Sequence, residues 1–341
     1  MRILRHESLR ARNTLALESY ASAYASVERD TALREALAWA EAEQLPVMAL
    51  GQGSNVVLAG DVAALVIQWA QCGITLLEED EESVVLAVAA GENWHSLVCW
   101  SLAQGYYGLE NLALIPGSVG AAPIQNIGAY GVELAPLIRC VSGVGIADRR
   151  DVVLSREECE FGYRDSIFKG TLRDQIFITS IEIMLSKKPR LQLAYPALRN
   201  YLDQHSAGEL SPQAVFNAVV ELRQSRLPNP AREPNAGSFF KNPVLSAQRA
   251  AQLQTDAPDM PQYPQSDGRV KLPAAWLIDQ CGWKGKRVGD VGVHPRHALV
   301  LVNYGGGQGD HLLALAGQIQ ASVLRVYGVE LEIEPRVYGG E

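Results

Sequence analysis

The chain has 341 residues and a formal net charge of −8, with 48% hydrophobic and 20% charged residues. This length is large for a single compact core and predicts two or three domains. The acidic balance argues against a nucleic-acid-binding surface. No window approaches the roughly 18 uninterrupted apolar residues of a membrane span. We therefore expect a globular protein with neither nucleic acid nor membrane as its partner.

The cysteines and the N-terminus indicate a cytoplasmic protein. The five cysteines are scattered and odd in number, and no two of them form a C-x-x-C pair. This pattern argues against a disulfide framework and a cysteine zinc site, and it fits a reducing compartment. Residues 1–14 lack the apolar core of a signal peptide.

The first part of the chain reads mainly as strands. Residues 19–28 alternate as a half-buried strand does, and 30–44 predict a helix with Asp30 as its N-cap. Another helix is expected from about 93 to 104. The remaining predicted strands are 46–51, 63–70, 73–79, 83–91 and several more within 139–186.

Beyond a join within 187–212, helices flank a small sheet. One helix is predicted over 212–227. The next is predicted over 271–282, with Gly282 as its C-cap. A long helix over 310–328 has Asp310 as N-cap and stops at Gly328. Residues 297–305 and 329–339 predict strands. The mixture predicts an α+β protein.

The common sequence motifs of cofactor binding and catalysis are absent. Gly51-x-Gly53 follows a strand but lacks the third glycine of a dinucleotide fingerprint. There is neither a P-loop nor a G-x-S-x-G elbow. His294 and His297 lie in HPRH with few carboxylates nearby, so we expect no metal site.

Two uncharged glycine-rich stretches remain, GQGSN at 51–55 and PGSVGAAPIQNIGAYG at 116–131. Glycine and proline make the second a poor helix and a poor strand, and a long surface loop is the alternative interpretation. Backbone N–H groups in such stretches can hold a diphosphate. Together the two stretches predict a nucleotide-type cofactor bound without a Rossmann fold.

Longer motifs then resemble one enzyme family. LGQGSNVVLAGD, NLALIPGSVGAAPIQNIGAYGVEL, CEFGYRDSIFK, NAGSFFKNP, LIDQCGWKGKRVG and LEIEPRVYG resemble the UDP-N-acetylenolpyruvoylglucosamine reductase (MurB) family, in that family's order from about Leu50 to Gly339. LAYPALRNYL at 193–202 resembles the extra segment of the family's type I members.

The resemblance implies an α+β fold with an FAD-binding part like that of vanillyl-alcohol oxidase. It implies two FAD-binding subdomains, 1–70 (joined by the C-terminal strand 331–341) and 71–200, and a substrate-binding domain at 212–330. It further implies non-covalent FAD, NADPH as hydride donor, UDP-N-acetylglucosamine enolpyruvate as substrate and no obligate protein partner. NADPH and substrate are expected to bind one cleft in turn, because no separate nicotinamide-nucleotide motif is visible.

The cofactor-binding residues that the resemblance implies lie in the two glycine-rich stretches and at the C-terminus. They are Gly51, Gly53, Ser54, Asn55, Pro116, Gly117, Ser118, Gly120, Ala121, Gln125, Asn126, Gly128, Ala129, Tyr130, Gly131 and Arg336.

Three catalytic residues match the family's positions. Reduction of an enolpyruvyl ether needs a cation or acid at the developing enolate and a proton donor for carbon. The resemblance implies Arg164 as enolate stabiliser, Ser238 as proton donor and Glu334 beside the substrate carboxylate. Pro335 follows Glu334, whereas the family usually places proline before this glutamate, so Glu332 remains an alternative.

A local basic cluster around Ser238 suits a nucleotide-sugar diphosphate. The substrate-binding residues implied by the resemblance are Tyr195, Arg223, Arg226, Lys241 and Asn242. Two other functions remain open at this point. One is another FAD-dependent oxidase or dehydrogenase of the same fold, and the other is an inactive paralogue that binds a nucleotide-sugar.

Overall fold

The computed structural model describes residues 1–205 and 209–340, which form two compact units built from interleaved stretches of chain. Unit 1 consists of Met1–Glu7, Ala21–Gly53 and Ala63–Ser225. Unit 2 consists of Ser8–Tyr20, Ser54–Val62 and Arg226–Glu341. The division into three parts expected from the sequence stays a prediction.

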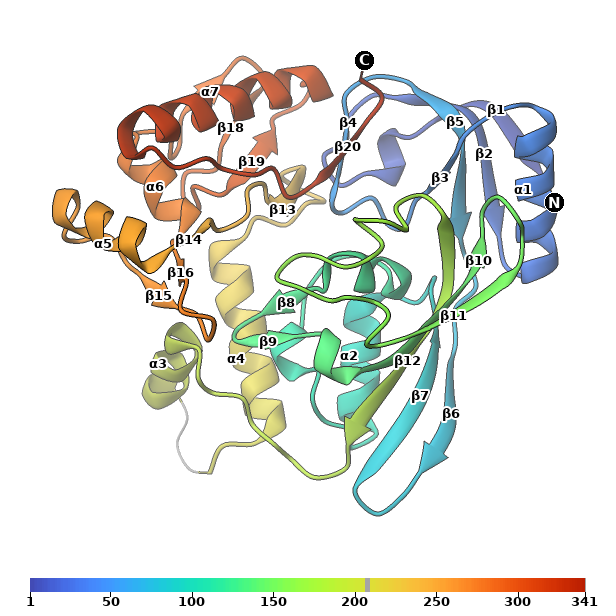
Figure 1. The fold of residues 1–341 in the computed structure, drawn as a ribbon, viewed down its shortest axis with the longest axis horizontal. Helices are drawn as coiled ribbons and strands as arrows, with labels where there is room; N and C mark the ends of the chain where they lie inside the picture. The colour runs from blue at the N-terminus through green and yellow to red at the C-terminus, as the bar shows by residue number, and fades with distance from the viewer. Residues whose placement is uncertain (206–208, 341) are drawn as a thin grey trace. The chain divides into compact units, whose positions relative to one another are not determined.

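Unit 1 contains two large sheets in addition to a two-stranded ribbon. One has the order β1-β2-β5-β3 and consists of Ile3–Ser8, Tyr20–Val27, Val62–Trp69 and Val47–Ala49. The other has the order β11-β10-β12-β7-β6 with antiparallel neighbours, and consists of Asp151–Ser155, Ile138–Gly145, Ile176–Ser186, Ser83–Ala89 and Ile74–Glu79 (Figure 1).

Four helices bury apolar faces against these sheets in one continuous core. They are α1 (Asp30–Ala42), α2 (Trp94–Ala103), α3 (Pro196–His205) and α4 (Pro212–Arg226). Leu33 and Leu37 of α1 and Leu97 of α2 are almost fully buried. The core therefore follows from the 3.6-residue spacing of apolar side chains on each helix.

The stretch 109–135 has neither a long helix nor a long strand, as its composition predicts. It consists of 3-10 turns and a short ribbon of β8 (Gly128–Ala129) and β9 (Val132–Glu133). Leu114, Asn126 and Tyr130 adopt left-handed backbone conformations with φ of 56°, 44° and 49°. Such angles are uncommon for residues with a Cβ and mark a segment held by its surroundings.

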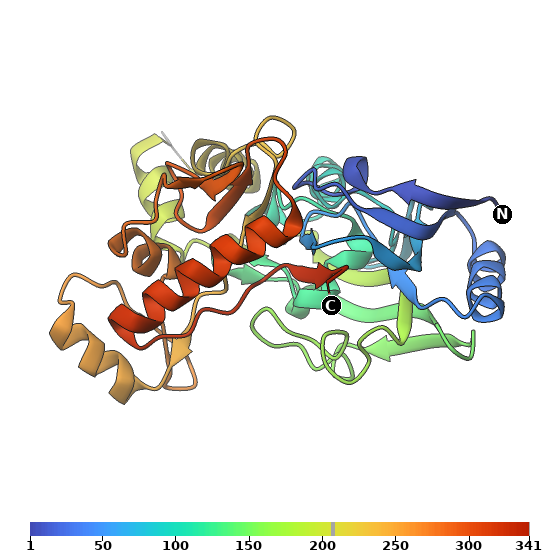
Figure 2. The same ribbon diagram turned by 90° about the horizontal axis from the view of Figure 1, so that it is seen from above.

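Unit 2 is centred on a sheet with the order β13-β19-β18-β17, made of Asn235–Ser238, Val300–Asn303, Val291–Val293 and Arg287–Val288. Helix α7 (Gly309–Tyr327) lies along this sheet beside α6 (Ala274–Gln280), as both ribbon views show (Figure 2). A smaller sheet combines β14 (Val244–Leu245), β16 (Val270–Lys271) and β15 (Tyr263–Pro264), next in sequence to α5 (Ala247–Asp256). At the C-terminus, β20 (Arg336–Tyr338) pairs in parallel with β4 (Val56–Leu58).

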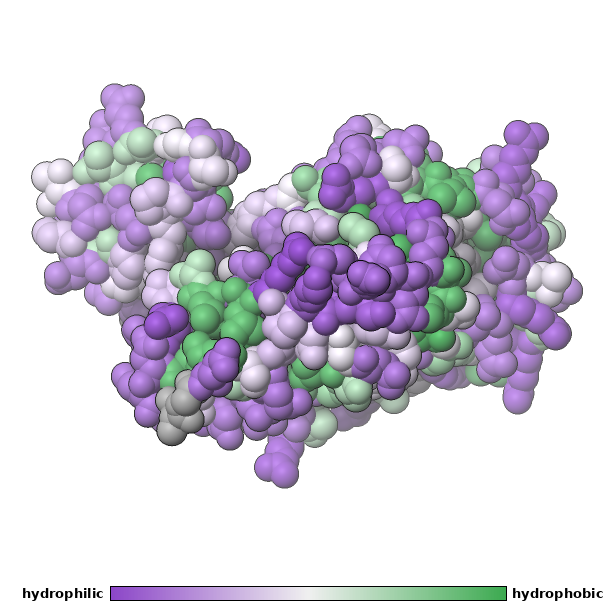
Figure 3. Space-filling view, turned by 90° about the horizontal axis from the view of Figure 1, so that it is seen from below, coloured by the Kyte–Doolittle hydropathy of each residue, from purple (hydrophilic) through white to green (hydrophobic). Residues whose placement is uncertain are grey.

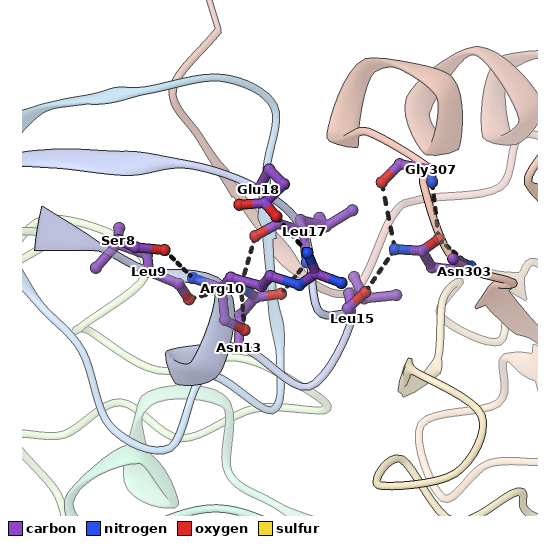
Figure 4. A network of polar contacts seen from close by, with 10 residues as sticks. Ser8, Leu9, Arg10, Asn13, Leu15, Leu17, Glu18, Asn303 and Gly307 are labelled. Carbon is purple, nitrogen blue, oxygen red and sulfur yellow. Dashed lines mark hydrogen bonds and ion pairs between the residues drawn. The ribbon is translucent and has the colours of Figure 1, made fainter.

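Two buried asparagines hold residues 8–20 in place: Asn13 bonds within this stretch, and Asn303 joins it to the rest of unit 2 (Figure 4). The Asn13 amide donates to the carbonyls of Leu9 and Leu17, and its oxygen accepts from the Leu17 N–H at 2.9 Å. The Asn303 amide donates to the Leu15 carbonyl at 2.9 Å and to the Gly307 carbonyl at 3.2 Å. Each side chain replaces hydrogen bonds that an irregular backbone cannot make with itself.

The predicted helices and strands are largely confirmed, with four corrections at their ends. Arg29, not Asp30, is the N-cap of α1, because its backbone is extended and Asp30 is already helical. Gln308, not Asp310, caps α7, and Cys281 is the C-cap of α6, with Gly282 following at φ 74°. The final strand is shorter than 329–339 because only Arg336–Tyr338 pairs in a ladder.

Strand β1 and helices α3 and α5 were not predicted from the sequence. Hydrophilic residues cover most of the face shown in Figure 3, and hydrophobic residues gather in separate areas. Within the described ranges, we find no helix with the length and apolar character needed to cross a bilayer. All five cysteines are free thiols.

Two glycines of α7 allow a matched test of close backbone packing. A Cβ on Gly309 would overlap the Leu58 carbonyl and lie 2.6 Å from the Ala59 Cα, whereas nothing lies within 4 Å of one on Gly317. We expect Gly309→Ala to lower the free energy of unfolding by about 2–4 kcal/mol through overpacking. Gly317→Ala should raise it by about 0.5–1 kcal/mol through helix propensity. Urea titrations measure both, and equal effects would contradict this account.

Candidate active site

The two glycine-rich stretches meet within unit 1. A Cβ on Gly51 would collide with the Ser118 hydroxyl. The two segments of the chain are therefore too close at this point for any residue with a side chain at position 51. Gln68 donates to the Gly51 carbonyl at 3.1 Å, and Asn93 donates to the Gln52 side chain at 3.2 Å. Small residues at these positions therefore bring two backbone segments side by side.

Part of the second stretch is packed on the strand end before α2. The Gly120 N–H donates to the Ala90 carbonyl at 2.9 Å, and a Cβ on Gly120 would lie 2.5 Å from the Ala90 Cβ. Gly117 and Gly131 have φ of 125° and 83°, which favour glycine. A close-packed, uncharged stretch of small side chains suits the diphosphate of a dinucleotide such as FAD.

The predicted cofactor-binding residues divide between the units. Unit 1 contains Gly51, Gly53 and the predicted residues of the 116–131 stretch. Unit 2 contains Ser54, Asn55 and Arg336. There the Arg336 N–H donates to the Asn55 carbonyl at 3.1 Å. Their role toward a cofactor stays a prediction.

Arg164 occupies the tip of a tight turn from Gly162 to Asp165, with φ of 53°. Its Nη2 donates to the Gly128 carbonyl at 2.8 Å, which joins the turn to the glycine-rich stretch. Its guanidinium also lies 5.5 Å from the centre of the Tyr163 ring. The structure thus brings one predicted catalytic residue to the predicted cofactor stretch.

Arg223, on α4, lies next to Arg164 in the charge environment of unit 1. Burial lowers the pKa of Arg223, which the Tyr130 hydroxyl raises and the Arg164 cation lowers further. Its Nε is sealed from solvent and has no hydrogen-bond partner among the described residues. An enclosed guanidinium nitrogen whose charge interacts unfavourably with a second cation is a favourable place for an anion.

His95, which the sequence analysis did not single out, stands beside this pair. Its Nδ1 accepts from the Leu114 N–H at 3.1 Å, and its ring stacks on Phe216 of α4 with centroids 5.8 Å apart. Burial, and secondarily the Arg223 cation, lower the pKa of His95. A neutral imidazole is therefore favoured next to Arg223, and it adds no third positive charge.

Tyr195 lies against the same stretch. Its ring meets that of Tyr130 edge-on with centroids 5.3 Å apart. The Asn111 amide donates to the carbonyls of Tyr130 and Gln192, both at 2.9 Å, and so connects the two segments. The predicted substrate-binding tyrosine and the predicted cofactor stretch are thus neighbours.

In unit 2, Ser238 and Glu334 lie on adjacent segments. The Glu334 N–H donates at 2.9 Å to the carbonyl of Phe239, the residue after Ser238. The Glu332 carboxylate forms an ion pair with Lys241 and is 68% exposed. This geometry favours Glu334 over Glu332 as the glutamate near Ser238. The predicted substrate ligand Lys241 is instead paired with Glu332.

The structure also reveals an open hollow in unit 2 that the sequence analysis missed. It is lined by Ala275, Trp276, Asp279, Lys284, Arg296, His297 and Ala298. Asn242 supports one wall, because its oxygen accepts from the Ala274 N–H at the start of α6. The lining residues of the hollow are dispersed over 275–298, so no short motif in the sequence indicates it.

Burial lowers the pKa of His297 to about 4, assisted by the cations of Arg226 and Lys284 and by the charge that His294 carries when protonated. Its Nδ1 accepts from the Leu299 N–H at 3.3 Å, which leaves the ring proton on Nε2. Arg226, a predicted substrate ligand, thus belongs to the same charge environment as the hollow. Within the described ranges, no three His, Cys, Asp or Glu residues gather as metal ligands.

Two family models match the chain. The description of one is "FAD binding domain", over residues 21–154, and that of the other is "UDP-N-acetylenolpyruvoylglucosamine reductase, C-terminal domain", over residues 229–338. A UDP-N-acetylenolpyruvoylglucosamine reductase of Chromobacterium violaceum is 47% identical, with 96% of this chain and 97% of the relative covered. This chain belongs to that reductase family. Another member, from Pseudomonas putida, is 45% identical over 97% of both chains.

Solved structures agree. The family's reductase from Thermus caldophilus aligns over 99% of both chains with a TM-score of 0.69 and 25% identity. p-Cresol methylhydroxylase aligns over 97% of this chain and 84% of its own with a TM-score of 0.51 and 10% identity, which shows the fold alone. The predicted family and the α+β fold with an FAD-binding part are confirmed.

The buried His297 generates a prediction for acid stability. Its pKa is about 4 in the folded chain against 6.5 for an ordinary histidine, so the unfolded chain takes up a proton first as pH falls. The free energy of unfolding should therefore drop between about pH 6.5 and 4, by at most roughly 3 kcal/mol from this residue. In His297→Gln this contribution is removed. Urea titrations from pH 8 to 4 should give curves that coincide above pH 7 and diverge below; parallel curves would contradict the prediction.

Proposed function

We propose that this chain is an NADPH-dependent, FAD-containing reductase that converts UDP-N-acetylglucosamine enolpyruvate to UDP-N-acetylmuramate for peptidoglycan precursor synthesis in the cytoplasm. The observation that carries this proposal is the arginine pair of unit 1. Arg223 is half-buried with an enclosed Nε that has no hydrogen-bond partner among the described residues, and the Arg164 cation contributes to the lowered pKa of Arg223. Membership of the reductase family supplies the substrate class, and five free cysteines suit a reducing compartment.

The arginine pair suits the carboxylate of an enolpyruvyl group. Two guanidinium groups repel one another when they are buried, and a bound carboxylate converts that repulsion into attraction. The planar donor fork also orients a carboxylate better than an ammonium group does. We assign Arg164 to the developing enolate and Arg223 to the substrate carboxylate.

The glycine-rich cradle of unit 1 and residues Ser54, Asn55 and Arg336 would hold FAD. When bound, FAD supplies the hydride, drawn from NADPH, that the methylene carbon of the substrate receives. Ser238 donates a proton to the neighbouring carbon, so that the carbon–carbon double bond becomes a single bond. Arg164 stabilises the negative charge that precedes protonation, and Glu334 adjoins the substrate carboxylate.

The hollow of unit 2 suits the nucleotide part of the substrate. Lys284, Arg296 and the nearby Arg226 supply positive charge for a diphosphate, partly offset by the 3.0 Å ion pair of Lys284 with Asp279. Trp276 offers an aromatic face to a base, and neutral His297 offers an N–H donor. NADPH and substrate would bind in turn, because the sequence carries no second dinucleotide motif.

The decisive experiment follows the visible spectrum of the purified protein without oxygen. We expect a yellow protein that bleaches with NADPH and regains its colour when UDP-N-acetylglucosamine enolpyruvate is added. Recovery of colour establishes donor and acceptor together. A protein that bleaches and stays bleached would refute the substrate assignment, and one that does not bleach would refute NADPH.

Arg223→Met tests the anion role of the arginine pair. We expect bleaching by NADPH to persist, while recovery of colour with the nucleotide-sugar slows by about 100- to 1,000-fold. The free energy of unfolding should stay equal or rise, because a buried like charge is removed. Arg156→Met, at an exposed arginine paired with Glu157, is the matched control. Loss of stability together with unchanged recovery of colour would contradict the assignment.

A further inference from the structure

The turn that carries Arg164 is fastened at both ends to the glycine-rich stretch. At its start, the Asn126 amide donates to the Gly162 carbonyl at 3.0 Å. After its end, the Ser166 hydroxyl donates to the Ile124 carbonyl at 2.6 Å, and Ser166 is 4% exposed. Between these attachments, Arg164 holds a left-handed backbone conformation that costs on the order of 1 kcal/mol or more. The surrounding bonds must maintain that conformation.

Asn126 is the centre of the first attachment. It is 1% exposed, and its amide donates to the Glu133 carboxylate at 2.9 Å as well as to Gly162. Its oxygen accepts from the Ala135 N–H at 2.8 Å. The whole side chain is therefore engaged inside the chain, where it uses both amide protons.

These contacts close a ring through Arg164. Asn126 binds the Gly162 carbonyl at the base of the turn, and Arg164 at the tip binds the Gly128 carbonyl. Gly128 pairs with Glu133 across the β8–β9 ribbon, and Glu133 accepts from Asn126. Each contact restrains the next. A shift of the Asn126 amide therefore displaces the Glu133 side chain, the paired Gly128 carbonyl and the Arg164 guanidinium that donates to this carbonyl.

We propose that Asn126 and Glu133 are positioning residues that aim the Arg164 guanidinium for the oxidative half-reaction, in which substrate accepts the hydride. The inference rests on the proposed role of Arg164. Asparagine suits the position for two reasons: it tolerates the left-handed backbone, and it donates two protons while it accepts one. Aspartate keeps the shape, loses both donors and sets a second carboxylate against Glu133.

The test uses three variants with FAD bound, in rapid-mixing experiments that separate reduction by NADPH from reoxidation by UDP-N-acetylglucosamine enolpyruvate. Asn126→Asp should slow reoxidation by about 10- to 100-fold, because small misplacements of a catalytic group are costly. Reduction by NADPH should change by less than about threefold. Glu133→Gln should be mild, because its amide oxygen still accepts from Asn126.

The double variant Asn126→Asp/Glu133→Gln provides the rescue. The new amide at 133 donates to the new carboxylate at 126, which replaces repulsion by a hydrogen bond. We expect at least about half of the logarithmic loss in reoxidation rate to be regained. A residue that only fills space would show no such recovery, so absence of rescue overturns the part of the proposal that assigns a positioning role to Glu133.

Asn13→Asp is the matched control, since Asn13 is a buried asparagine with the same bonding pattern in unit 2. It should destabilise the protein yet leave both half-reactions of the FAD-bound enzyme within about threefold. If Asn126→Asp does not fold, Asn126→Gly keeps the left-handed backbone and removes the side-chain bonds. It should slow reoxidation selectively.

Equal slowing of both half-reactions, or loss of flavin, would show that Asn126 supports the cofactor stretch and overturn the positioning role. Arg164→Met separates this outcome from failure of the proposed function. If Arg164→Met leaves reoxidation intact, Arg164 itself has no role and the proposed function of the residue fails. If Arg164→Met slows reoxidation while Asn126→Asp does not, only the positioning inference fails.

Discussion

The backbone of residues 109–135 has to find hydrogen-bond partners without a helix or a long strand, and much of unit 1 is arranged around this requirement. Buried backbone N–H and C=O groups that stay unpaired are costly. The Gly117 carbonyl accepts from the Trp94 N–H, and the Leu134 N–H donates to the Ile127 carbonyl. Side chains complete the set, with Asn111 and Asn126 acting as substitutes for missing backbone partners. Irregular chain thereby becomes rigid enough to present functional groups.

The second constraint is electrostatic. The Arg223 Nε is enclosed, and the Arg164 cation opposes the charge of Arg223. The neighbouring histidine is kept neutral by burial, which limits the repulsion. Functional sites commonly retain such unfavourable arrangements because a ligand of opposite charge relieves them. The proposed binding of an anion would account for both the irregular backbone and the like charges.

Sequence reasoning predicted the helices with strong apolar periodicity and the position of both glycine-rich stretches. It misplaced the N-caps of α1 and α7, in both cases by choosing an aspartate that lies inside the helix. In α7, the start of the helix is also fixed by the packing of Gly309 against Leu58, which only the fold reveals. The hollow around His297 escaped it, since its walls come from α6 and from a loop some twenty residues later. Arg164 could be named from its motif, but the Asn126–Glu133–Gly162 contacts depend on long-range geometry that no local pattern records.

The parallel pairing of β20 with β4 has a consequence for biosynthesis. Val56–Leu58 leave the ribosome long before their partner Arg336–Tyr338. Unit 2 therefore stays incomplete until β20 has emerged, while all of unit 1 precedes residue 226. Until then, the β4 edge exposes unpaired backbone groups that could pair with another nascent chain. The topology thus makes the interval between the synthesis of β4 and that of β20 a period of vulnerability to misassembly.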